Sequence, residues 1–117
     1  MNKRKFSKAG RPDRCPVIFI STFSNKKDAL AFAKSILFLK LAVCANIVPK
    51  IISLYVWKGK IENQREVLLI GKTTSSAFLK LKAKISQIHP YEIPELISVD
   101  VNDGHKPYLD WLMNSGK

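Results

Sequence analysis

The sequence predicts an α+β fold in which two helices cover one face of an antiparallel sheet. Four apolar runs have the length of strands, and helix-period patterns separate the first from the second run and the third from the fourth. The connection between the two middle runs is short enough for a hairpin. With 117 residues and 46% apolar residues, the chain has the size and composition of one globular domain.

The first strand and the first helix are expected directly after a basic N-terminal segment. Residues 17–21 form a continuous apolar run, which is typical of a central strand covered on both faces. Ser24 or Asn25 offers an N-cap, and Asp28 places negative charge in the first turn of a helix of about four turns. Residues 45–57 then predict a long strand with a bend or bulge at Pro49, because proline cannot donate to a sheet ladder.

The next strand is expected over residues 66–73, and the hairpin turn before it has two candidate positions. One is at residues 58–59 and the other is at residues 62–65. We favour the second, with Gly59 as an interior kink, because residues 60–61 then extend the preceding strand. If no bulge shifts this register, the expected cross-strand pairs are Tyr55 with Lys72 and Trp57 with Ile70.

The second half of the chain repeats the helix and the strand. A cap cluster at residues 74–76 precedes one apolar helical stripe, and the prolines of the segment 89–96 end that helix. Residues 96–101 form the fourth strand, and Pro107 begins a short last helix. With right-handed crossovers, this order is the βαββαβ ferredoxin-like sandwich with a short C-terminal helix.

The second face of this sheet has no predicted cover. Residues 67–70 are apolar on both sides of the strand, and so are residues 47–52 apart from Pro49 and Lys50. Two helices cover only one face, and an exposed apolar face of several hundred Å² is unusual on a monomer. The sequence therefore predicts self-association.

Charge and cysteine content limit the class of protein. The formal net charge is +11, and +5 of it falls in residues 1–14, which hold six lysines and arginines and one aspartate. We expect residues 1–16 to be a basic, disordered tail and residues 17–117 to be a single domain. No apolar run approaches the ~20 residues of a membrane helix. Two cysteines are too few for a disulfide scaffold, so we expect a cytoplasmic protein with no membrane partner.

Five ordered segments resemble the CutA family of divalent-cation tolerance proteins. The three signature blocks correspond to residues 53–62 (SLYVWKGKIE), 66–74 (EVLLIGKTT) and 89–96 (HPYEIPEL), and residues 41–47 and 108–112 also match. The resemblance covers residues 17–114 and implies a non-enzymatic homotrimer, similar in architecture to PII signalling proteins and associated with copper and other divalent cations. The residues expected at the trimer interface are Trp57, Leu68, Ile70 and Trp111.

The candidate metal ligands are His89, Glu92 and Glu95. In bacterial members linked to copper, a cysteine ends the first strand and two histidines precede the proline of the third block. The matching positions here are Ser21, Ile88 and His89, so only one of the three family ligands is present. Copper(I) prefers sulfur ligands. We therefore expect at most a weakly bound divalent cation, copper or zinc; alternatively the loop carboxylates are structural.

A second set of side chains could line a cleft for a small anionic ligand. It consists of Tyr55, Trp57, Glu66, Lys72 and Tyr91. The alternative is that the aromatic rings are interface packing and that Lys72 pairs with a carboxylate. The cleft keeps open a second function, that of a PII-like small-anion signalling or scaffolding trimer.

Nucleic-acid binding and catalysis are less favoured. The RNA-recognition motif shares the βαββαβ order, but it stacks bases on aromatic residues of its first and third strands. Here residues 66–73 contain no aromatic residue, and the first strand contains only Phe19. The sequence shows neither a Gly-rich phosphate loop nor a nucleophile elbow, so we do not expect an enzyme.

Overall fold

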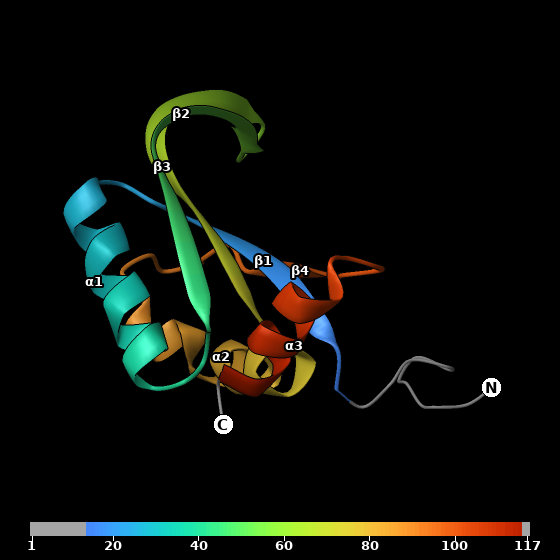
Figure 1. The fold of residues 1–117 in the computed structure, drawn as a ribbon. Coiled ribbons are helices and arrows are strands. Elements are labelled where there is room, and N and C mark those ends of the chain that lie inside the picture. Colours follow the sequence, from blue (N-terminus) through green and yellow to red (C-terminus); the bar gives the residue numbers. More distant parts are fainter. Residues whose placement is uncertain (1–13, 116–117) are drawn as a thin grey trace.

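The computed structural model describes residues 14–115, which form four strands and three helices (Figure 1). In chain order these are β1 (Pro16–Phe23), α1 (Lys26–Phe38), β2 (Cys44–Trp57), β3 (Lys60–Thr74), α2 (Ser75–Ile88), β4 (Ile97–Asp100) and α3 (Lys106–Ser115). The strands form one antiparallel sheet in the order β2-β3-β1-β4. The predicted βαββαβ sandwich with a C-terminal helix is confirmed. None of the helices described is long and apolar enough to cross a membrane.

Of the tail predicted for residues 1–16, residues 1–13 lie outside the described part of the chain. The last three of its residues are attached to the fold. The Arg14 guanidinium donates to the carbonyl of Met113, and the Cys15 amide donates to Ser75 Oγ over 2.9 Å. Pro16 begins β1 opposite Thr74.

One face of the sheet packs on α1 and α2 and forms the core. Both helices begin at caps that the sequence predicts: Asn25 Oδ1 accepts from the Asp28 amide over 2.8 Å, and Thr74 Oγ1 accepts from the Ala77 amide over 3.2 Å. The core is a single cluster of apolar side chains, with the Phe19 and Phe78 rings 5.9 Å apart. Helix α1 ends near Leu39, so its 13 residues are close to the expected four turns.

Helix α3 covers part of the opposite face. It packs on β1 and β3, and its Leu112 is only 2% exposed although it lies outside the main core cluster. Side chains alternate along a strand, so Lys72 points away from the core, to which its neighbour Thr73 contributes. The Lys72 ammonium lies 5.7 Å from the centroid of the Tyr108 ring in α3. The second face is thus covered at this end only.

The β2–β3 hairpin turns at Lys58 and Gly59, which have φ of 50° and 79°. Positive φ at both central residues is the geometry of a two-residue hairpin turn that matches strand twist. The turn predicted at residues 62–65 is therefore wrong, and so are the pairs derived from it. The observed pairs are Tyr55 with Glu62, Trp57 with Lys60, Cys44 with Lys72 and Asn46 with Ile70. The bulge predicted at Pro49 is confirmed by a register shift between Val48 and Ile51.

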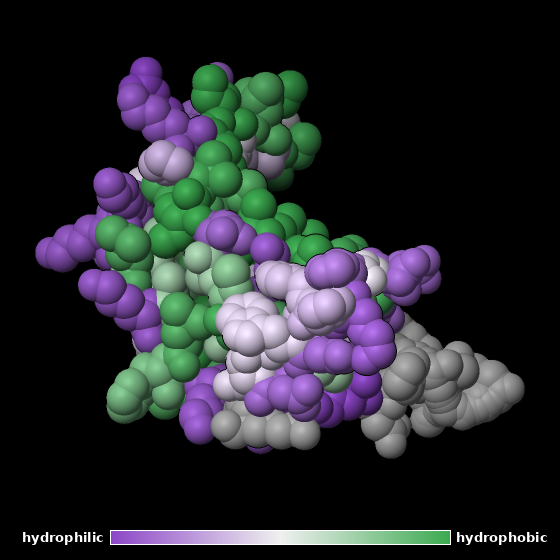
Figure 2. Space-filling view, in the orientation of Figure 1, coloured by the Kyte–Doolittle hydropathy of each residue, from purple (hydrophilic) through white to green (hydrophobic). Residues whose placement is uncertain are grey.

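Residues 49–66 form a two-stranded arm, because β1 pairs with β3 only from Val67 onward. The arm curls over beyond the end of β1 at the top of Figure 1. Its back is aliphatic and exposed: Val56 and Ile61 face each other across the ladder and are 72% and 79% exposed. Ile52 and Leu54 continue the stripe on the same strand face. Figure 2 shows hydrophobic surface gathered over the arm.

Gly71 offers a test of the core. It pairs with Phe19, and a Cβ added at Gly71 would overlap the Phe19 ring. We expect Gly71→Ala to lower the free energy of unfolding by about 1–3 kcal/mol, the usual cost of overpacking, in urea titrations at fixed protein concentration. The same substitution in a Phe19→Leu background should cost clearly less. An equal cost in both backgrounds would show that the ring contact is not the cause.

Candidate functional site

The His89 side chain joins the loop after α2 to the end of β1. Its Nε2 lies 3.0 Å from the carbonyl oxygen of Thr22 and 3.1 Å from Ser21 Oγ, and its Nδ1 accepts the Tyr91 amide over 3.0 Å. The imidazole stacks on Phe23 with ring centroids 4.3 Å apart. Both ring nitrogens therefore have protein partners, and they connect segments almost seventy residues apart in sequence.

These contacts determine the protonation state of His89. A carbonyl oxygen only accepts, so Nε2 carries the proton, and Nδ1 is unprotonated because it accepts from Tyr91. The ring is thus neutral. Burial lowers the pKa of His89 below its usual value of 6.5, while the Thr22 hydrogen bond and the negative charge of Asp28 act in the opposite direction.

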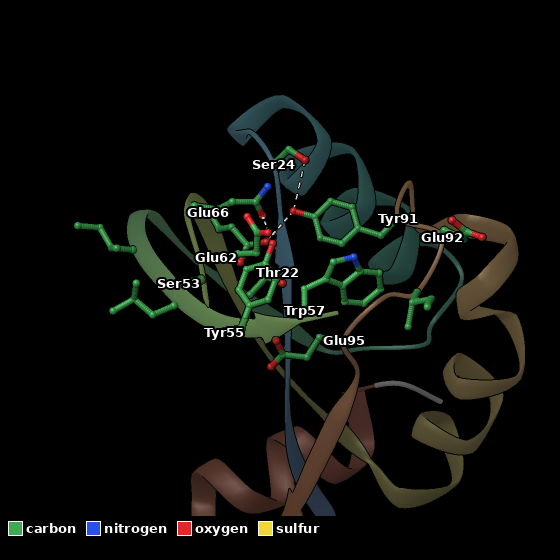
Figure 3. A pocket seen from close by; sticks show the side chains of 14 residues that line it. Thr22, Ser24, Ser53, Tyr55, Trp57, Glu62, Glu66, Tyr91, Glu92 and Glu95 are labelled. Atoms are coloured by element: carbon green, nitrogen blue, oxygen red, sulfur yellow. Dashed lines mark hydrogen bonds between the residues drawn. The ribbon is translucent and has the colours of Figure 1, made fainter. Parts of the chain in front are cut away.

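Tyr91 carries the connection from the loop to β3. Its hydroxyl donates to Glu66 Oε2 over 2.7 Å and accepts from Ser24 Oγ over 3.3 Å (Figure 3). Burial raises the pKa of Tyr91 to about 12, the Ser24 hydrogen bond lowers it, and the Glu66 carboxylate raises it further. The phenol therefore remains a donor at neutral pH and holds the carboxylate of a residue that is only 8% exposed.

An open pocket of about 940 Å³ lies between the arm, the end of β1 and the loop after α2 (Figure 3). We call it the acidic pocket. Its charged lining residues are Glu62, Glu66, Glu92 and Glu95. Three aromatic residues, Tyr55, Trp57 and Tyr91, also line it, and Tyr55 is held by a 2.8 Å hydrogen bond to Gln64. No lysine, arginine or histidine of residues 14–115 is among the lining residues.

The carboxylates of this pocket disfavour one another's charge. Burial raises the pKa of Glu95, and the neighbouring Glu66 carboxylate raises it further. In the described part of the chain, Tyr91 is the only hydrogen-bond donor to the Glu66 carboxylate, and no basic side chain forms an ion pair with it. A cation entering the pocket would relieve this repulsion.

The structure brings together four of the five predicted cleft residues. Tyr55, Trp57, Glu66 and Tyr91 line the acidic pocket, whereas Lys72 is not among the lining residues and lies over Tyr108. Within the single chain Lys72 lies away from the other four because it pairs with Cys44, at the opposite end of the ladder from Tyr55. Without this lysine the charged side chains are all negative, so the pocket does not have the polarity expected of an anion site.

The predicted metal ligands are divided between two environments. Glu92 and Glu95 line the acidic pocket, whereas His89 points to Ser21 and Thr22. Among residues 14–115, no group of three or more histidine, cysteine or acidic side chains is placed to hold a metal ion. Ser21, which the resemblance placed at a ligand position, contacts the imidazole.

The residues predicted for the trimer interface differ in exposure. Trp57 and Trp111 are each 48% exposed, and Leu68 and Ile70 are half-buried in the single chain. Glu62 is a pocket residue that the sequence prediction missed, since it was assigned to the turn. Choosing the turn at residues 58–59 would have placed it opposite Tyr55 and so in the cleft.

Comparisons with known proteins agree in one family. A model of the CutA1 divalent ion tolerance protein family matches residues 17–115. A divalent-cation tolerance protein CutA of Thermus thermophilus is 39% identical over 95 residues, covering 81% of this chain and 92% of that protein.

Two further relatives extend the similarity. The chloroplastic protein CutA 1 of Oryza sativa is 40% identical over 99 residues, 85% of this chain, which spans about 56% of the rice protein. The structure of the periplasmic divalent cation tolerance protein CutA of Archaeoglobus fulgidus has a TM-score of 0.82 and 31% identity, covering 87% of this chain and 99% of that one.

The neutral, buried His89 predicts a pH-dependent stability. Its pKa is lower in the folded than in the unfolded chain, so between the two values the unfolded state binds more protons and stability rises with pH. We expect the free energy of unfolding to fall as pH is lowered from 7.5 through 6.5 toward 5.5 in urea titrations. His89→Gln should be less stable at pH 7.5 and should show a smaller pH slope.

The exposed His105 provides the matched control. His105→Gln should keep the wild-type dependence of the free energy of unfolding on pH. Because Glu95 is present in all three proteins, a difference between their slopes measures the contribution of the substituted histidine. An unchanged slope in His89→Gln would contradict the assignment.

Proposed function

Because the chain belongs to the CutA1 divalent ion tolerance family, we propose that it is a non-enzymatic, homotrimeric protein that binds a divalent cation in its acidic pocket. The observation that carries the proposal is the charge of the pocket. Four glutamates line it without a basic residue of the described chain, on a protein of net charge +11. Such a concavity focuses negative potential and attracts cations.

We place the cation at Glu66 and Glu95. The charge of Glu66 raises the pKa of Glu95, so the two carboxylates repel each other, and a cation bound at either of them would relieve this repulsion. Carboxylate oxygens suit hard divalent ions and also bind Zn²⁺, whereas copper(I) prefers sulfur ligands. With fewer than three ligands gathered in the described chain, water or a second copy would complete the coordination, and binding would be weak.

Of the three ligands predicted from the sequence, Glu95 is retained and Glu92 is available at the same pocket. His89 is proposed as a positioning residue. Its Nδ1 holds the Tyr91 amide, and Tyr91 in turn holds Glu66. A metal at the imidazole would have to displace the Tyr91 amide or the Thr22 carbonyl.

The arm supports the homotrimer. Its aliphatic back is exposed in the single chain, and burial of apolar area contributes roughly 25 cal/mol per Å² to association. The proposed interface comprises this back together with Trp57, Leu68, Ile70 and Trp111, which were expected there from the sequence. Because the arm also forms a wall of the acidic pocket, a second copy packed on the arm would lie next to this pocket.

A small-anion function has one observation in its favour. A neighbouring hollow of about 600 Å³ is lined by Lys26, Lys50 and Arg65, beside the start of α1. Glu66 also lines it, however, and opposes an anion there. The cytoplasmic location stays a prediction, because the rice relative is named as chloroplastic and the Archaeoglobus fulgidus relative as periplasmic.

Metal titration tests the cation proposal. We expect saturable, weak binding of Zn²⁺ to the wild-type protein by calorimetry, because the cation neutralises two repelling carboxylates. Glu95→Gln should weaken this binding about tenfold, since it removes one charged ligand. Asp103→Asn, an equal loss of charge at an exposed position, should leave it unchanged. Equal binding by wild type and Glu95→Gln would refute the placement.

Light scattering tests the assembly. We expect a mass of three times the 13.2 kDa chain. Val56→Lys should reduce the mass to that of one chain while the circular dichroism spectrum stays the same. Val56 is exposed in the single chain, so the substitution removes only apolar contacts that form on assembly. Leu79→Lys, an equivalent change at an exposed position of α2, should remain trimeric. A trimeric Val56→Lys protein would exclude the arm from the interface.

A further inference from the structure

We propose that the acidic pocket also binds an organic cation of the aliphatic diamine class. The proposal rests on the cation preference of the same pocket but concerns a different chemical class of ligand. The whole chain contains nine acidic residues, and four of them, Glu62, Glu66, Glu92 and Glu95, line this one pocket. An otherwise basic protein therefore gathers its negative charge where a ligand has access.

Glu66 is the residue that points to an amine. It is more than nine-tenths buried, it lies in the pocket wall, and only its Oε2 has a hydrogen-bond donor within the described chain. A buried carboxylate without a paired cation is costly. An ammonium group brings both a positive charge and three donors, which suits the unpaired Oε1 atom.

The aromatic lining distinguishes this pocket from a simple ion site. Tyr55 and Trp57 project from the arm, and Tyr91 projects from the loop opposite them (Figure 3). Aromatic faces attract ammonium groups and also pack against the methylene groups between them. Ile93 adds further apolar surface. A bare metal ion cannot use these side chains, whereas an alkyl diamine can.

Size leads to the same class of ligand. A pocket of about 940 Å³ is at the upper end of the usual range for small-molecule sites, ~300–1,000 Å³. It is far larger than a single ion requires. Because the carboxylates come from both the arm and the loop, two ammonium groups on one flexible chain could each reach a carboxylate.

Calorimetry on the full-length protein tests the proposal, with 1,5-diaminopentane as the probe and 1,5-pentanediol as its neutral analogue. We expect saturable binding of the diamine and none of the diol. Glu66→Gln keeps the acceptor for Tyr91 but removes the charge, and it should weaken diamine binding about tenfold. Tyr55→Leu should weaken it by removing a ring. Asp110→Asn, the same charge change on α3, should have no effect.

Each outcome either supports or overturns the proposal. The proposal would be overturned if the diol bound as tightly as the diamine, or if the diamine gave no saturable heat. It would also be overturned if Asp110→Asn weakened diamine binding as much as Glu66→Gln does. If Glu66→Gln does not reach the wild-type circular dichroism spectrum, Glu95→Gln takes its place. A parallel Zn²⁺ titration separates the two proposals: zinc binding without diamine binding refutes only this inference, and diamine binding without zinc binding refutes only the divalent-cation function.

Discussion

Pairing of β2 with β3 through a two-residue turn fixes both the arm and the pocket beside it. Positive φ at Lys58 and Gly59 sets the register, and the register sets which side chains share a face. One face of the arm then presents Tyr55, Glu62 and Trp57 to the acidic pocket, while the other presents an exposed aliphatic stripe. The same hairpin thus supplies both a pocket wall and the surface proposed for assembly, so the two properties are coupled by geometry.

The second constraint is the buried imidazole of His89. It has one fixed tautomer because its partners are a carbonyl oxygen and a backbone amide. Through Tyr91 this tautomer is connected to Glu66, so the position of a pocket carboxylate depends on a histidine outside the pocket. A histidine that the sequence marks as a metal ligand here organises the loop. The contacts through Tyr91 support the positioning role proposed for His89.

The negative charge of the acidic pocket follows from the same register of β2 and β3. Had Lys72 faced Tyr55, the cleft would have combined aromatic rings with a cation and favoured anions. In the observed ladder Lys72 lies over Tyr108, and Glu62 takes the position opposite Tyr55. The pocket is consequently negative on a positive protein, and this charge supports the proposal of a cationic ligand.

The sequence was enough to predict the order of the elements, the two helix caps, the bulge at Pro49 and the family, because each depends on local periodicity, capping chemistry or short motifs. It also brought four of the five cleft residues into one set. The position of the turn, the place of Lys72 and the hydrogen-bond partners of His89 became visible only in the folded chain. These depend on which of two plausible turns closes the hairpin and on contacts between residues 25 to 68 positions apart. Local propensity does not encode such distances, since the free energy that selects among them comes from packing of the whole chain.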